Sequence, residues 1–294
     1  MRRTYIISFA FIIVACCTYA AWAASPDAAM QGASSPGEKL PGIDPVIKSK
    51  TSQGDVICPT ADEEARKLYN EAIDLEAHGK FAEAKEKYLK AIERDPGYCD
   101  AMDNIGVIFR HEGDISQAIH WYERSIAVKP DNPVAHQDLA VAYSIRGDAE
   151  KTLAEYRWLA GKYPENPEGF YGLGMTFLGL NQPQDAVRPL ERAEELYRAS
   201  SSPLIGDARH LLGVACFGLK DYARARDYLT LSYAGLENDA DVNYLLGLCY
   251  IDPSIKDIGK AREYLFKARQ LGKTIPPELL RELDEVTGPR DRPF

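Results

Sequence analysis

The chain has 294 residues, of which 45% are hydrophobic and 27% charged. This globular composition excludes a largely disordered chain, a collagen and a protein with many membrane spans. The 35 lysines and arginines stand against 44 aspartates and glutamates, and the net charge of −9 argues against a general nucleic-acid binder, whose affinity comes from neutralising phosphates. Six cysteines in a chain of this length are too few for a disulfide-built scaffold.

Residues 1–23 have the pattern of a secretory signal peptide. Two arginines precede an uncharged apolar stretch, and small residues lead to Ala23, after which we expect cleavage. Residues 13–16 also resemble a bacterial lipobox, in which Cys16 would carry a lipid and become the N-terminus. An uncleaved anchor is a third alternative. All three predict an exported, periplasmic protein, which in the second case is anchored in the outer membrane by its lipid.

Residues 24–59 are predicted to form a flexible linker, because this stretch holds five prolines, four glycines and few large apolar residues. It would be a tether if the N-terminus is membrane-bound and a disordered lead if it is not. After the linker, Thr60 and Glu63 have the spacing of a capping box, which predicts the start of a helix.

From residue 65 the sequence is periodic. Six segments follow one another at spacings of 34 residues, with one spacing of 39; they begin at Ala65, Cys99, Pro133, Pro167, Gly206 and Ala240. Position 8 of each segment is alanine or glycine, and position 24, allowing for an insertion in the sixth segment, is Tyr88, Tyr122, Tyr156, Leu190, Leu229 or Leu265. Because glycine inside a helix costs about 1 kcal/mol relative to alanine, its recurrence at position 8 indicates that a neighbouring helix approaches the backbone there. Each segment therefore predicts two antiparallel helices.

The residues between these helices agree with the division. Three glycines are placed to end first helices through a positive φ, and four aspartates are placed to cap second helices. They are Gly79, Gly113 and Gly147, and Asp114, Asp148, Asp221 and Asp257. In the fourth segment Asn181 replaces the glycine and Pro183 begins the next helix.

This pattern resembles the tetratricopeptide repeat family, whose unit of 34 residues is a helix pair. The resemblance covers residues 65 to about 273 and implies an all-α fold: a right-handed α-solenoid of six repeats, with a concave groove lined by the first helices. The solenoid is expected over residues 60–287, with a capping helix at 276–287 and a frayed tail at 288–294. The departures from the family pattern are expected to weaken individual repeats, mostly the fifth; they are Glu71, His136, Arg209, Asn243 and an insertion at 201–205.

The resemblance places positions 2, 5, 9, 12 and 13 of each repeat on the concave side. In the first three repeats these positions are mostly polar, as in Arg66, Tyr69, Asp100, Asp103, Arg110, His111 and Gln137. In the last three they are mostly apolar: Tyr171, Met175, Leu178, His210, Val214, Phe217, Tyr244, Leu248 and Ile251. Apolar side chains on a surface that should face water predict a partner-binding groove. The alternative is that curvature or the capping helix buries this stripe inside the protein.

Four cysteines remain after cleavage at Ala23, and they allow three pairings. Cys58 and Cys99 lie near the starts of neighbouring first helices, so a disulfide between them is one expectation if their Cα atoms come within about 7 Å. Four free thiols are the alternative. Cys216 and Cys249 are predicted to be small buried side chains rather than a bridge.

Chemically reactive patterns are weak in this sequence. The five histidines lack the spacing of metal ligands, and the tripeptide at 272–274 lacks the glycine and the preceding strand of a phosphate-binding loop. We predict a protein that is not an enzyme, with no cofactor and no metal. It should bind other proteins, favouring an apolar or basic segment in its groove, and should not bind nucleic acid.

By analogy with exported members of the family, we expect a role in the assembly of an envelope complex. A homo-oligomeric structural coat and an accessory subunit of an enzyme complex are the alternatives. The partner's identity, self-association and an N-terminal membrane tether remain open at this point.

Overall fold

The computed structural model describes residue 58 and residues 60–287. The predicted signal peptide, Cys16, nearly all of the predicted linker and the tail lie outside the described residues. The described helices divide into two compact units, one ending at Tyr163 and the other beginning at Pro164. We call them the N-terminal unit and the C-terminal unit.

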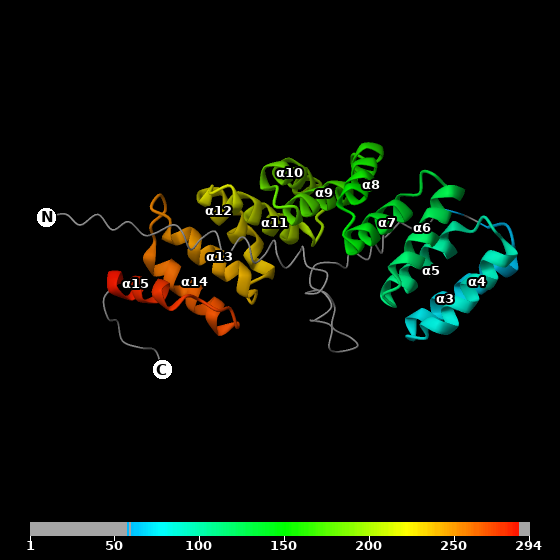
Figure 1. Cartoon of the computed structure of the whole chain (residues 1–294), viewed down its shortest axis with the longest axis horizontal. Coiled ribbons are helices and arrows are strands. Elements are labelled where there is room, and N and C mark those ends of the chain that lie inside the picture. Colours follow the sequence, from blue (N-terminus) through cyan, green and yellow to red (C-terminus); the bar gives the residue numbers. More distant parts are fainter. Residues whose placement is uncertain (1–57, 59, 288–294) are drawn as a thin grey trace. The chain divides into compact units, whose positions relative to one another are not determined.

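Among the described residues, the N-terminal unit consists of three helix pairs (Figure 1). Each pair packs on the next through its second helix. The pairs are α3 (Glu63–Ala77) with α4 (Phe81–Arg94), α5 (Cys99–His111) with α6 (Ile115–Val128), and α7 (Pro133–Arg146) with α8 (Ala149–Lys162).

The C-terminal unit repeats this arrangement and ends with one more helix, α15 (Pro277–Thr287), which packs on α14. Its pairs are α9 (Pro167–Gly179) with α10 (Pro183–Ala199), α11 (Ile205–Gly218) with α12 (Tyr222–Ser232), and α13 (Ala240–Ile251) with α14 (Ile258–Gln270). A short 3-10 helix, η2 (Tyr233–Gly235), follows α12. The predicted all-α fold of repeated helix pairs with a C-terminal helix is confirmed. Within the described ranges, none of the helices has both the length and the apolar character needed to cross a bilayer.

The glycines at position 8 explain how the two helices of a pair fit together. A Cβ atom added at Gly106 in α5 would lie 2.4 Å from a ring carbon of Tyr122 in α6. Gly174, Gly213 and Gly247 face Leu190, Leu229 and Leu265 in the same way, at 2.3, 2.6 and 2.6 Å. In these four repeats, the glycine of the first helix is what lets the large side chain of the second helix reach the backbone, as predicted.

Replacement of Gly106 by alanine should lower the free energy of unfolding of the N-terminal unit by about 1–3 kcal/mol, because the tyrosine ring must move out of a packed core. The matched control is Gly161→Ala in α8, where an added Cβ meets nothing within 4 Å. That change should stabilise the unit by up to about 1 kcal/mol. Denaturant unfolding followed by the fluorescence of Trp121 and Trp158, which both lie in this unit, measures the two effects. Equal stability of Gly106→Ala and the wild type would contradict the close approach.

The turns follow the predicted backbone chemistry. Gly79, Gly113 and Gly147 have φ values of 74°, 83° and 82°, and Asn181 has 56°. Asp114, Asp148, Asp221 and Asp257 accept hydrogen bonds from backbone N–H groups in the first turns of α6, α8, α12 and α14. The last two repeats use Lys220 and Lys256 in the left-handed region, with φ of 63° and 46°, which was not predicted.

The start of α3 differs from expectation. Asp62, rather than Thr60, caps this helix, because its carboxylate accepts a hydrogen bond from the Ala65 N–H at 2.9 Å. The Thr60 hydroxyl lies too far upstream for this role and instead accepts from the N–H of Asp62 at 3.2 Å.

Candidate binding surfaces

The nine residues of the predicted groove lie on three first helices of the C-terminal unit, α9, α11 and α13. Neighbouring helices of this series, α9 with α11 and α11 with α13, contact one another. The residues form three rows by repeat position: Tyr171, His210 and Tyr244 at position 5; Met175, Val214 and Leu248 at position 9; and Leu178, Phe217 and Ile251 at position 12. We call these nine residues the apolar stripe.

Two members of the apolar stripe belong to the core rather than to the surface. Phe217 is 3% exposed and packs edge-to-face on Tyr222, with ring centroids 5.3 Å apart. Leu248 is 9% exposed and belongs to the same hydrophobic cluster, which also takes in Leu279 of α15. The other seven side chains are half-buried. Any partner that binds along the stripe therefore contacts those seven.

Carboxylates lie near the position 5 row. Burial lowers the pKa of His210, and the negative charges of Asp239, Asp207 and Asp241 oppose this effect. Burial has the larger effect, so the ring is neutral at neutral pH. Its Nε2 atom is buried without a hydrogen-bond partner among the described residues.

One of these carboxylates is paired within the unit. Lys273, in the connection between α14 and α15, forms an ion pair with Asp241. The Lys273 Nζ also lies 5.5 Å from the centroid of the Tyr244 ring. The position 5 row thus already holds one cation between a carboxylate and an aromatic ring.

The polar residues predicted for the first three repeats lie partly inside the N-terminal unit. Asp103 and Gln137 are buried, at 4% and 6% exposure. Asp100, Tyr69 and Arg110 are half-buried, whereas Arg66 and His111 are exposed. These residues therefore do not form a continuous polar surface that is exposed to solvent.

Asp103 differs from the other residues of this set because its carboxyl is buried and its pKa is raised. Its Oδ2 accepts a hydrogen bond from Asn132 Nδ2 at 2.7 Å, while its Oδ1 has no partner among the described residues. Burial raises the pKa of Asp103 to about 7, more than its hydrogen bonds with Ser125 and Asn132 lower it. Nearby, burial raises the pKa of Asp138 to about 6, although Arg110 lies 3.5 Å from its carboxylate.

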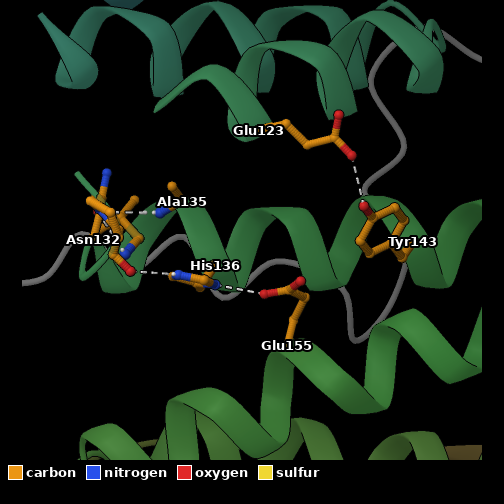
Figure 2. Close-up of polar contacts among 8 residues, drawn as sticks. Glu123, Asn132, Ala135, His136, Tyr143 and Glu155 are labelled. Atoms are coloured by element: carbon orange, nitrogen blue, oxygen red, sulfur yellow. Dashed lines mark hydrogen bonds and ion pairs between the residues drawn. The ribbon is translucent and has the colours of Figure 1, made fainter. Parts of the chain in front are cut away.

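The departures from the repeat pattern have polar partners that were not predicted. His136 is held on both sides (Figure 2): its Nδ1 lies 2.6 Å from a Glu155 oxygen and its Nε2 lies 3.1 Å from the Pro130 carbonyl. Its ring also stacks on Trp158, with centroids 3.5 Å apart. A polar residue at position 4 is thus integrated into the packing of α7 against α8.

The same holds for the other departures. Arg209 donates to Glu194 at 2.9 Å, Asn243 donates to the Asp239 carbonyl at 2.7 Å, and Lys87 donates to Glu71 at 2.5 Å. Figure 2 also shows a related contact across α6 and α7, in which the Tyr143 hydroxyl donates to Glu123 at 2.9 Å.

Cys58 and Cys99 are joined by a disulfide, and their Cα atoms are 5.6 Å apart. The Asp100 carboxylate accepts a hydrogen bond from the backbone of Cys58, so this segment is held to the start of α5 twice. Among the described residues, these two sulfurs and the Asp100 carboxylate are close enough together to be considered as metal ligands, but the disulfide uses both sulfurs. Cys216 and Cys249 are free and buried.

Comparisons with known proteins agree with the repeat pattern. A family model described as tetratricopeptide repeat matches residues 69–133 and 171–241. Photosystem I assembly protein Ycf3 of Rippkaea orientalis is 33% identical over 75 residues, which are 24% of this chain and 43% of that protein. The chain thus matches less than half the length of this curated relative.

Two solved structures show the same fold. PilF of Pseudomonas aeruginosa has a TM-score of 0.63 and 20% identity, and the match covers 77% of this chain and 99% of that one. YrrB, described as a repeat protein with an unusual peptide-binding site, has a TM-score of 0.53 and 21% identity, with 68% and 97% covered. At these identities the likeness concerns the fold alone.

Proposed function

This chain belongs to the tetratricopeptide repeat family, and we propose that it is a non-catalytic scaffold that binds segments of other proteins along the first helices of its C-terminal unit. The observation that carries this proposal is the apolar stripe. Seven of its side chains remain half-buried on three adjacent first helices, and further burial of such side chains by a partner would be favourable. The peptide-binding site named for YrrB supports the same use of the fold.

Mutation of the stripe should separate binding from stability. Met175→Gln combined with Val214→Thr keeps the shapes of two half-buried side chains and removes their apolar character. We expect the amount of partner protein that the full chain captures after cross-linking to fall about tenfold. This factor corresponds to a loss of roughly 1.4 kcal/mol of binding free energy. Helicity and the unfolding midpoint should change little.

The matched control is Val187→Thr in α10, which makes the same change at a half-buried site of a second helix. It should leave capture intact. Equal capture by the double variant and the control would contradict binding along the stripe. Phe217→Ala is unsuitable here, because removing a core aromatic side chain costs about 3–5 kcal/mol of stability.

The proposed location is the periplasm or the outer membrane, and the proposed process is assembly of an envelope complex. Residues 1–23 support export by their signal-peptide pattern. The name of the Rippkaea relative, an assembly protein, supports a role in assembly. Size-exclusion chromatography with light scattering distinguishes such a scaffold from a homo-oligomeric coat.

Cell fractionation with mass spectrometry of the N-terminus tests the location. A chain that begins at Ala24 in the periplasmic fraction, or at a lipid-modified Cys16 in the outer-membrane fraction, is the expected result. A chain that retains Met1 in the cytoplasmic fraction would overturn export.

A further inference from the structure

The position 5 row of the apolar stripe differs from the other two rows in its charge. Asp207 lies in the first turn of α11, Asp239 is the N-cap of α13, and Asp241 lies in the first turn of α13. The charges of all three carboxylates act on His210. Lys273 is the cation that pairs with this group. Three carboxylates with one lysine and a neutral histidine leave an excess of negative charge at this end of the stripe.

A lysine of the same unit already occupies one part of the position 5 row. Lys273 reaches the row from outside α13, pairs with Asp241 and lies over the face of Tyr244. A cation held by a carboxylate and an aromatic face is a favourable arrangement when it is partly removed from water. This internal lysine occupies the part of the row contributed by α13.

The part of the row on α11 also combines a carboxylate, Asp207, with a ring, His210, but no lysine or arginine of the described residues pairs with that carboxylate. Asp207 is exposed, and its carboxylate forms no hydrogen bond or ion pair with the described residues. One oxygen of Asp239 caps α13 by accepting from the N–H groups of Asp241 and Val242. His210 stands between Tyr171 and Tyr244 in the row, and its Nε2 is buried without a partner. A buried polar atom without a partner is costly, and a ligand that supplies one is favoured.

We propose that the C-terminal unit binds a protein segment in which a lysine or arginine adjoins apolar residues, with the cation between Asp207 and Asp239 beside His210 and the apolar side chains on Met175 and Val214. The inference rests on the proposed function and specifies the chemistry of its partner. Opposite charge selects such a segment and disfavours acidic ones. Arginine fits best, because its planar group pairs with carboxylates and stacks on rings at once.

Labelled model peptides test the proposal with the full-length protein. One peptide alternates leucine and arginine; the second replaces each arginine with citrulline, which has nearly the same shape and no charge. Fluorescence anisotropy should show the arginine peptide binding at least about tenfold more tightly. The double variant Asp207→Asn and Asp239→Asn should lose that preference, and asparagine at 239 retains the helix cap.

The control variant is Glu263→Gln on α14, an exposed carboxylate outside the row. It should bind both peptides as the wild type does. Equal binding of the two peptides by the wild type, or an unchanged preference in the double aspartate variant, would overturn the cation site.

The two proposals fail in different ways. If the wild type captures partner proteins after cross-linking and the double aspartate variant captures them equally well, the cation site is refuted while the scaffold function stands. If Met175→Gln with Val214→Thr captures partners as the wild type does, and the wild type binds neither peptide, both are refuted.

Discussion

Replacing Cys58 and Cys99 by serine is expected to lower the free energy of unfolding of the N-terminal unit by about 4 kcal/mol. The disulfide closes a loop across a sequence separation of 41 residues, which contains α3, α4 and the start of α5. Such a link reduces the conformational freedom of the unfolded chain, and the effect grows with the logarithm of the loop length. Denaturant unfolding followed by the fluorescence of Trp121 and Trp158 measures the change.

Reductant provides the control. It should destabilise the wild type to the level of the double serine variant and should leave the variant unchanged. In non-reducing thiol labelling of the unfolded protein, Cys216 and Cys249 should react while Cys58 and Cys99 do not. Labelling of Cys58 and Cys99 without reductant would refute the bridge.

The features that could be predicted from the sequence are those imposed by the backbone. Gly106 and Gly247 are visible in the sequence because no other residue allows Tyr122 or Leu265 to approach so closely. Asp114 was predictable for a similar reason, since a helix start needs an acceptor within a few residues. Local requirements of this kind repeat with each segment, and their recurrence therefore predicted the fold.

Partners distant in sequence could not be predicted in this way. His136 and Arg209 look like defects at position 4, but each meets a carboxylate, Glu155 or Glu194, on an adjacent helix. A repeat alignment compares equivalent positions and carries no information on which side chains meet between helices. Such pairs are found only when the helices are packed together.

The candidate surface shows the same limit. Repeat register correctly assigns Phe217 to the first helix of the fifth repeat, but register alone does not reveal that its ring packs on Tyr222. Asp207 and Asp239 lie at the starts of α11 and α13, where aspartate is common, so neither residue stands out in the sequence. Their convergence on His210 depends on the contact between α11 and α13, which only the structure provides.

Asp103 should make the stability of the N-terminal unit fall as the pH rises. Burial raises the pKa of its carboxyl from 3.8 to about 7, so the folded state binds a proton that the unfolded state has released. The stabilisation is complete below about pH 4 and is lost as the pH rises through about 7. At about 1.4 kcal/mol per pH unit, the loss over this interval is on the order of 4 kcal/mol. Asp138 contributes in the same direction, because burial also raises its pKa.

Asp103→Asn isolates the effect of this one carboxyl. Asparagine keeps an oxygen to accept the hydrogen bond from Asn132 and cannot ionise. The variant should therefore resemble the wild type at about pH 4 and be clearly more stable at about pH 8, with unfolding again followed by tryptophan fluorescence. Glu93→Gln, an exposed change on α4 in the same unit, should leave the pH profile as it is. If Asp103→Asn instead destabilises the unit equally at both pH values, the carboxylate is ionised in the folded protein, and a cation within the unit must then compensate its charge.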